Sequence, residues 1–361
     1  MKIKTLGLSV IFILLSCKSV QERDNKMDEK ANSDAITEVA SFKGQQVTGV
    51  TATDKGRLFV NFPRWRKGVN SSVVEIIPNS DPESYPNESW NSWEIDEPIA
   101  ENKFIGVQSV LAFEDNLYVL DTRSQLFQNV MDAPRIFVFD LATDTLSKTY
   151  ILEEASYYKD SYINDLRVDK KNNRIYLTDS GHPGLVIVDI DSEKTRRVLN
   201  EHTSTTAEQS YLTFGEKEWE NTIHSDGIAL DIKNERLFYH ALTGYSLYSI
   251  STDALKVKDG EPIEDQVTFE TKTAAPDGMI FDDKGNLYFA DLGHHKIQYR
   301  TPEGNIYTLA EGEQIRWADT FSIYEDYLYF TNSRIHEVGA DISSMTFSLN
   351  KIKLPSSQEA H

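Results

Sequence analysis

The sequence predicts an all-β fold, a six-bladed β-propeller with four-stranded blades. The prediction rests on a repeated hairpin motif, on its spacing and on the strands that follow each copy. The motif is clearest at Pro276–Asp291, PDGMIFDDKGNLYFAD, where an apolar run, a polar turn and a Leu-aromatic-apolar segment follow one another. The five other copies are Thr48–Phe62, Gln108–Asp121, Asn164–Asp179, Ser225–His240 and Ala318–Asn332.

One column of the motif is aromatic in every copy: Phe59, Tyr118, Tyr176, Phe238, Tyr288 and Tyr329. Turns such as Asp54-Lys55-Gly56 contain residues that tolerate φ > 0, so each copy predicts a hairpin. The copies recur about every forty to sixty residues, which is typical of propeller blades. β-rich segments such as Arg135–Asp140 follow the hairpins. The hairpin is therefore expected to supply the two inner strands of each blade.

Residues 1–17 predict a lipoprotein-type signal peptide. A basic start with Lys2 and Lys4 precedes the apolar run Leu6–Leu15, which is too short to span a bilayer comfortably. The following LLSC segment resembles a bacterial lipobox, in which the cysteine, here Cys17, is lipidated. Export and lipid anchoring place the protein in the bacterial cell envelope, on the periplasmic side or at the surface. The alternative is an ordinary secretory signal with an incidental cysteine.

Cys17 is the only cysteine, which excludes an intrachain disulfide and a cysteine-based metal site. Residues 18–38 are polar and charged and predict a flexible tether. The propeller is expected over residues 39–354, followed by a disordered tail at 355–361.

Two segments outside the motif carry expectations of their own. The polar insertion Glu201–His224 has the length of a lid or rim of a binding site and is expected to contain a short helix. Met345–Leu354 is expected to supply an outer strand that closes the ring.

The chain of 361 residues has a formal net charge of −20, which becomes about −22 once the signal peptide and its two lysines are removed. Such a surface repels phosphate backbones and anionic headgroups, so nucleic-acid binding is disfavoured and the acyl chains are the expected membrane contact. The charge suits a cationic or neutral small molecule as partner. The sequence contains no signal for an oligomeric state.

The candidate site follows from hairpin geometry. The first strand's start and the second strand's end lie at one edge of a sheet, so these positions are expected to ring one mouth of the central channel. Consecutive blades place Asp165, Asp226, Asp277 and Asp319 there. Converging carboxylates raise one another's pKa unless cations or donors compensate.

Three outcomes remain open for this acidic ring. Asn164, Asp226 and Asp277 could hold Ca²⁺ through oxygen ligands. An organic amine could pair with the acids between aromatic walls such as Phe62, Trp65 or Phe321. Each aspartate could instead accept backbone N–H bonds and cap its own blade.

Residues at the strand ends complete the candidate site. His182 is a candidate general base and Asp277 the carboxylate that shuttles protons with it, although a loop histidine without a catalytic role is the alternative. The ligand-binding candidates are Phe62, Arg64, Trp65, Arg123, Asn164, Asp165, Asp226, Asp277, Asp319 and Asn332.

The chain resembles the major royal jelly protein/yellow family over nearly its whole mature length. The PRW segment at 63–65 and the WADTFS segment at 317–322 are specific. Longer matching segments are GVTATDKGRLFVNFPRW (49–65), INDLRVD (163–169), PDGMIFDDKGNLYFAD (276–291) and IRWADTFSIYEDYLYFTNSRI (315–335). The resemblance implies a six-bladed propeller. Some insect members are associated with dopachrome conversion, some salivary members bind biogenic amines and others are nutritional.

The acidic positions also resemble those of gluconolactonase/regucalcin-type propellers, in which Glu, Asn and Asp ligands hold a metal. Blade one here has Gly49 in place of the glutamate. The leading hypothesis is therefore an envelope-anchored propeller that binds an amine or catechol-like molecule in its channel. The alternatives are an enzyme at the same mouth, either a dopachrome-type tautomerase or a metal-dependent lactonase or esterase, and a non-catalytic protein-interaction scaffold.

Overall fold

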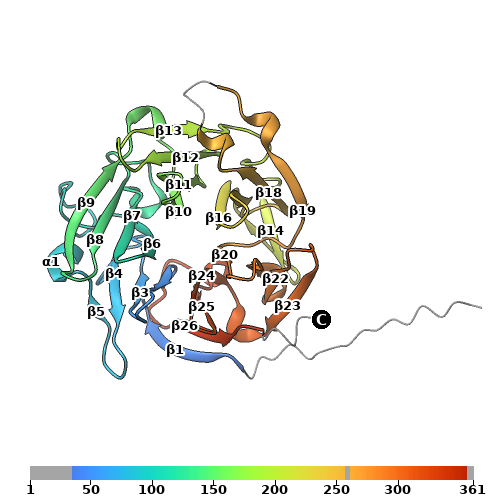
Figure 1. Ribbon diagram of the computed structural model, residues 1–361. Helices are drawn as coiled ribbons and strands as arrows, with labels where there is room; N and C mark the ends of the chain where they lie inside the picture. The colour runs from blue at the N-terminus through green and yellow to red at the C-terminus, as the bar shows by residue number, and fades with distance from the viewer. Residues whose placement is uncertain (1–34, 257–260, 356–361) are drawn as a thin grey trace, which may run out of the picture. The chain divides into compact units, whose positions relative to one another are not determined.

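The computed structural model describes residues 35–256 and 261–355 and confirms the six-bladed β-propeller (Figure 1). Six four-stranded antiparallel sheets surround a common axis. The predicted signal peptide, Cys17, most of the predicted tether and residues 356–361 lie outside the described residues. Within residues 35–256 and 261–355, no helix is long and apolar enough to cross a bilayer.

The first five blades run in chain order from the axis outward, and the repeated hairpin forms the two inner strands, as predicted. Blade one contains β2 (Val50–Ala52), β3 (Leu58–Asn61), β4 (Val73–Ile76) and β5 (Glu83–Ser84). Blade two contains β6 (Val107–Phe113), β7 (Asn116–Asp121), β8 (Arg135–Asp140) and β9 (Thr145–Ile151). Blade three contains β10 (Ile163–Asp169), β11 (Arg174–Asp179), β12 (Gly184–Asp189) and β13 (Thr195–Val198). Blade four contains β16 (Ser225–Asp231), β17 (Arg236–Ala241), β18 (Ser246–Ser251) and β19 (Thr268–Lys272). Blade five contains β20 (Met279–Phe281), β21 (Leu287–Asp291), β22 (Lys296–Arg300) and β23 (Ile306–Glu311).

Blade six closes the ring differently from the expectation. Its inner strands are β24 (Ala318–Tyr324) and β25 (Tyr327–Asn332), followed by β26 (Thr346–Lys353). The outermost strand is the N-terminal β1 (Thr37–Lys43), which pairs antiparallel with β26. The segment Met345–Leu354 therefore supplies the third strand, and the two chain ends close the ring together. β1 carries no copy of the repeated motif, which is why the sequence pattern did not show it, and it begins two residues before the predicted propeller boundary.

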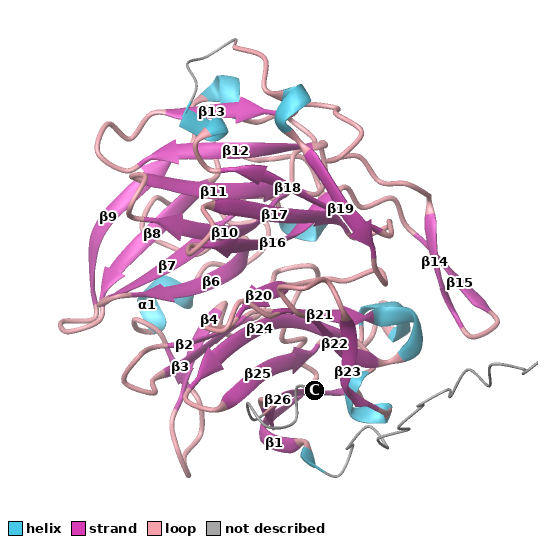
Figure 2. Cartoon of the chain, turned by 45° about the vertical axis from the view of Figure 1, so that its right-hand side comes forward, coloured by secondary structure: helices cyan, strands magenta, loops and turns pink. Residues whose placement is uncertain are grey.

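The insertion Glu201–His224 forms a two-stranded hairpin, not the expected short helix. β14 (Tyr211–Phe214) pairs with β15 (Lys217–Glu220) around a turn in which Gly215 has a φ of 61°. The hairpin projects beyond the ring of blades (Figure 2). In the described part of the chain, the helical elements include α1 (Glu88–Asn91) and short 3₁₀ turns at Gln125–Phe127, Glu154–Ser156, Ala254–Lys256, Glu264–Gln266, Leu292–His294, Glu313–Ile315 and Ile335–Glu337.

The aromatic column of the motif lies between the blades. All six of its side chains are less than one tenth exposed. Tyr118 of blade two packs against Leu166 and Val168 of blade three, and Tyr176 of blade three packs against Ile228 and Leu237 of blade four. Because burying a large apolar side chain is worth about 1.5–3 kcal/mol, this column accounts for much of the cohesion between sheets.

The innermost strands approach one another closely near the axis. Gly278 donates its N–H to the carbonyl oxygen of Asp319 in the next blade at 2.6 Å. A Cβ atom on Gly227 would lie 2.2 Å from the carbonyl oxygen of Asp277. The glycines of the SDG and PDG segments are therefore required by backbone packing between blades.

We expect Gly227→Ala to lower the free energy of unfolding by about 1–3 kcal/mol, because the added methyl group overpacks a backbone contact. Gly339→Ala is the matched control, since a Cβ atom there meets nothing within 4 Å. Denaturant unfolding of both variants checks the difference. Equal stability of the two variants would contradict the close approach at Gly227.

Candidate ligand-binding site

Backbone irregularities shape the start of three innermost strands. In β10, two residues, Asn164 and Asp165, occupy the space opposite Thr178. β16 and β24 have the same irregularity at Asp226 and at Asp319. A β-bulge of this kind bends the strand and changes where its side chains point. Asn164, Asp226 and Asp319 all line one cavity at the channel mouth.

This cavity has a volume of about 390 Å³. Every blade contributes to it, which places it on the propeller axis. Its aromatic walls are Trp65, Phe127, Tyr162, Trp219 and Trp317, and Ile223, Leu242 and Ile335 add aliphatic surface. The polar groups among its lining residues include Gln108, Asn164, Asp226, Asp277 and Asp319. The combination of apolar walls and a few convergent polar groups is typical of small-molecule sites.

Three carboxyl groups converge in the cavity. Burial raises the pKa of Asp226 well above its usual range, and the charges of Asp277, Asp319 and Asp165 raise it further. Burial also raises the pKa of Asp277 to about 7, although hydrogen bonds with Trp317 and Asp226 oppose the rise. The two carboxyl groups therefore interact directly, and the presence of Asp277 favours the protonated form of Asp226.

Asp319 completes this acidic group. Burial raises its pKa well above the usual range, and the negative charge of Asp277 adds to the effect. Its Oδ2 atom is buried and has no hydrogen-bond partner among the described residues. No lysine, arginine or histidine lies among the described residues that line the cavity. The acids are therefore gathered without a compensating cation.

Asp165 has a different environment from the other three leading aspartates. Its carboxylate accepts from Ser109 Oγ at 2.7 Å and pairs with Arg167 Nη1 at 2.9 Å. Arg167 also donates to the carbonyl oxygen of Met279 in blade five at 2.8 Å. Asp165 does not line the cavity, and Arg167, which compensates it, was not predicted from the sequence.

Residues at the ends of the second strands accept backbone N–H bonds and so cap their blades. From the sequence, this role was one of the alternatives for the aspartates at the starts of the first strands. Asp121 accepts from the N–H groups of Ile105 and Gly106 at 2.7 and 2.8 Å. Asn332 accepts from the N–H group of Trp317 at 3.0 Å. Asn332 therefore caps its own blade and is not a lining residue of the cavity.

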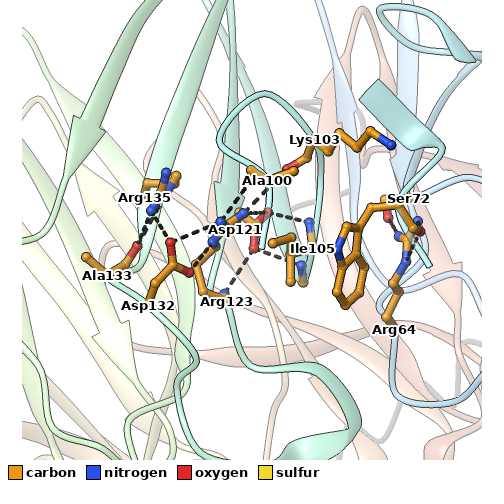
Figure 3. A network of polar contacts seen from close by, with 12 residues as sticks. Arg64, Ser72, Ala100, Lys103, Ile105, Asp121, Arg123, Asp132, Ala133 and Arg135 are labelled. Atoms are coloured by element: carbon orange, nitrogen blue, oxygen red, sulfur yellow. Dashed lines mark hydrogen bonds and ion pairs between the residues drawn. The ribbon is translucent and has the colours of Figure 1, made fainter. Parts of the chain in front are cut away.

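Arg123 is part of a buried ionic network (Figure 3). It is not among the lining residues of the cavity. Its side chain is fully buried, and its guanidinium binds Asp132 at 2.6 and 3.0 Å and Asp121 at 3.5 Å. Burial alone would lower its pKa, but the hydrogen bonds with Asp132 and the charge of Asp121 raise the pKa overall. Asp132 also pairs with Arg135. The guanidinium has no group left to orient an anionic ligand.

Arg64 is likewise occupied by the protein (Figure 3). It donates to the carbonyl oxygens of Trp93 and Asn91 at 3.1 and 2.9 Å and to the hydroxyl of Ser72. Burial lowers its pKa to about 10. Arg64 therefore holds the loop that carries Trp65 and does not itself line the cavity.

Two other candidates also lie away from the cavity. Phe62 is buried in the core, where its ring contacts Phe42 edge to face at 5.0 Å. The His182 ring stacks on the Tyr158 ring with their centroids 3.9 Å apart, and His182 Nδ1 lies 3.3 Å from Asp160 Oδ1. Neither side chain is among the lining residues of the cavity. The geometry gives His182 no contact with a ligand in the cavity.

The oxygen atoms at the mouth do not fit Ca²⁺, which takes about six to eight oxygen ligands. Asn164 Oδ1 already accepts from Gln108 Nε2 at 2.7 Å, and Asp277 Oδ2 accepts from Trp317 Nε1 at 2.6 Å. Gly49 supplies no side-chain oxygen. Over the described part of the chain, no three His, Cys, Asp or Glu side chains form a group that could hold a metal ion. No reaction step is therefore assigned to a metal.

Most of the aromatic wall was not predicted. Tyr162 and Trp317 immediately precede innermost strands, and Phe127 lies in the connection between β7 and β8. Trp219 belongs to the projecting hairpin, and it contacts Trp317 edge to face at 5.1 Å. The length of the insertion was the signal that predicted a lid or rim, and residues of the insertion, including Trp219 and Ile223, line the cavity.

Because the pKa of Asp277 is raised, we expect Asp277→Asn to stabilise the folded protein at neutral pH. In the folded protein the pKa of Asp277 is about 7, whereas that of an unfolded aspartate is about 3.9. The folded state therefore holds a proton that the unfolded state releases, and this contribution to stability is lost as the pH rises from about 4 to 7. Asparagine can still accept from Trp317 and donate to Asp226. We expect Asp277→Asn to raise Tm at pH 7.5 by roughly 2–5 °C and to flatten its pH dependence.

Asp121→Asn is the matched control, because Asp121 caps its blade and pairs with the buried Arg123. The substitution removes the charge of that pair. We expect it to cost about 3–5 kcal/mol. Thermal unfolding between pH 4 and 8 measures both variants. A loss of stability in Asp277→Asn equal to that of Asp121→Asn would show that Asp277 also serves as a cap.

Comparisons with known proteins agree with this architecture. A family model described as major royal jelly protein matches residues 112–356. Protein yellow of Drosophila erecta is 28% identical over 153 residues, which cover 39% of this chain and only 28% of that protein.

Among solved structures, a luciferin-regenerating enzyme has a TM-score of 0.55 at 11% identity, over 89% of this chain and 97% of that chain. A gluconolactonase of Xanthomonas campestris has a TM-score of 0.53 at 13% identity, over 90% of this chain and 91% of that chain. At these identities the likeness shows the fold alone. The family match extends over more than half of the chain, which therefore belongs to the major royal jelly protein family.

Proposed function

We propose that this propeller binds a small organic cation, an amine or an amine of catechol type with a flat apolar part, in the cavity on its axis. One observation carries the proposal: Asp226, Asp277 and Asp319 are buried together, and no basic side chain is among the described lining residues. Burying carboxyl groups without a compensating cation costs free energy, so a cationic ligand gains most where they lie.

The walls support the same ligand class. Trp65, Trp219 and Trp317 present indole rings to the cavity, and a cation over an indole face gains about 0.5–2 kcal/mol. The flat part of a ligand stacks against such rings, while its ammonium group pairs with the acids. The resemblance to a family in which some members bind biogenic amines points in the same direction.

We expect 2-phenylethylamine to bind more tightly as the pH rises from 5.5 to 8, because a cation pairs with ionised Asp277, whose pKa is about 7. Below that pKa, each unit by which the pH falls should weaken binding by up to about tenfold if one proton is linked to binding. Calorimetry in two buffers with different ionisation enthalpies measures both the affinity and the proton released.

Asp277→Asn should weaken binding at pH 8 by at least about tenfold, the effect of losing one charged partner in a buried site. Asp115→Asn, which removes an exposed carboxylate paired with Lys55, is the control and should bind as the wild type does. Binding that is independent of pH and unchanged in Asp277→Asn would remove the proposal.

A second candidate function rests on the neighbouring carboxyl groups of Asp226 and Asp277, both with raised pKa values. A pKa near 7 suits a general acid–base, and two neighbouring carboxyl groups can take a proton from one atom of a ligand and return it to another. Tautomerisation of a dopachrome-like ring needs only such a transfer. An absorbance assay with a dopachrome substrate distinguishes the two candidates, since a binding protein leaves the spectrum unchanged.

We also propose that the protein is exported and anchored through lipid on Cys17. The support is the LLSC segment after a short apolar run. In a bacterial host, labelled palmitate should be incorporated into the wild type and not into Cys17→Ser, and the variant should leave the membrane fraction. Labelling of Cys17→Ser would contradict this assignment.

A further inference from the structure

A chain of hydrogen bonds runs along one wall of the cavity through three blades. Trp65 Nε1 in blade one donates to the hydroxyl of Tyr162 at 2.6 Å. That hydroxyl donates to Gln108 Oε1 at 2.7 Å. Gln108 Nε2 in turn donates to Asn164 Oδ1 at 2.7 Å. All four residues line the cavity.

Chemistry fixes the direction of this chain. An indole N–H can only donate, so the Tyr162 oxygen accepts from Trp65 and its own proton is free for Gln108. Burial raises the pKa of Tyr162, so its hydroxyl stays protonated. The carbonyl end of Gln108 is thus held by Tyr162, and its NH₂ end faces Asn164. The backbone carbonyl of Gln108 is also held, by Asn61 Nδ2 at 3.1 Å.

The last residue of the chain faces the cavity with one group left over. Asn164 is 8% exposed, and its Oδ1 is used by Gln108. Its Nδ2 atom donates to no protein atom among the described residues. Asp319 Oδ2, in blade six, is a buried acceptor without a partner. Blades three and six face each other across the axis (Figure 1).

We infer that Trp65, Tyr162 and Gln108 are positioning residues that turn the NH₂ group of Asn164 into the cavity. The ligand then carries a hydrogen-bond acceptor toward Asn164 and its cationic group toward the acids on the other side of the cavity, Asp277 and Asp319, as in an amino ether, amino alcohol or amino ketone. This inference rests on the proposed binding of an organic cation. The same hydrogen bond with Gln108 holds Asn164 Oδ1 away from the cavity. A metal ligand would have to point its oxygen into the cavity.

The test compares 2-phenylethylamine with its methoxy derivatives, substituted on the side chain or at each ring position. A methoxy oxygen can only accept, so a derivative that reaches Asn164 should bind the wild type about tenfold more tightly than the parent amine. In Tyr162→Phe the chain is broken and this ratio should fall toward one. In Asn164→Asp, which keeps the acceptor for Gln108 but loses the donor, the preference should disappear or reverse.

Tyr158→Phe is the control, since Tyr158 is 42% exposed and does not line the cavity. Its ratio should equal that of the wild type. The inference is wrong if no methoxy derivative gains affinity, or if the gain survives in Tyr162→Phe.

A second measurement needs no ligand. In the side-chain amide spectra of ¹⁵N-labelled protein, the Gln108 NH₂ protons should exchange slowly in the wild type and at least about tenfold faster in Tyr162→Phe, because a protecting hydrogen-bond network is lost. Unchanged exchange would overturn the inference. If neither amine nor ether binds the wild type, the proposed function fails, and this exchange measurement alone decides whether the chain orients Asn164.

Discussion

The close packing of the innermost strands around the axis is the constraint on which the site depends. The carbonyl oxygens of the leading aspartates are used between blades: Asp226 accepts from Thr178 Oγ1 at 2.7 Å, and Asp319 accepts from the N–H group of Gly278 at 2.6 Å. With the backbone committed to these contacts, the side chains at the strand starts project into the channel mouth. The acidic cavity is thus a consequence of how the blades meet.

The two acidic columns of the motif have separate physical roles. The strand-end acids, such as Asp121 and Asp179, accept several N–H bonds and pair with buried arginines, so their charges are compensated inside their own blades. Of the acids at the strand starts, Asp165 pairs with Arg167, whereas Asp226, Asp277 and Asp319 lie together in the cavity, whose described lining residues include no basic side chain. Only the uncompensated column raises the free energy of the ligand-free protein, and only there does a cation have much to gain. Capping is therefore carried out by the strand-end residues, which leaves Asp226, Asp277 and Asp319 available for the proposed binding of a cation.

The repeat in the sequence was sufficient to predict the number of blades, the inner hairpins and the position of Asp226, Asp277 and Asp319 at one mouth. These features depend on strand periodicity and on which end of a hairpin a residue occupies, and both can be read from spacing. The contacts of Arg64, Arg123 and His182 could not be predicted, because they depend on how loops outside the repeat fold. Arg123, for example, reaches Asp132 only because the connection from β7 to β8 folds back, and Arg64 reaches the carbonyl oxygen of Trp93, 29 residues away. The closing strand β1 and the indole of Trp219 lie outside the repeat, so no column indicated them.

The buried arginines explain how loops without repeat structure form a wall of defined shape. Arg123 joins Asp121 to Asp132, so the segment between these acids is held at both ends. Within it, Leu126 and Phe127 have φ values of 55° and 52°, a strained conformation for bulky residues that requires support from the surroundings.

The Leu126 N–H group donates to the carbonyl oxygen of Arg64 at 2.9 Å, which ties this segment to the loop that carries Trp65. The rings of Phe127 and Trp65 then stack at 5.0 Å beside the acids. A change in these loops alters the aromatic wall and leaves the contacts between the innermost strands in place. The acids, in contrast, cannot move unless those contacts between strands also change. The ring of blades therefore sets the position of the acidic groups in the cavity, and the loops held by Arg64 and Arg123 set the shape of its aromatic wall.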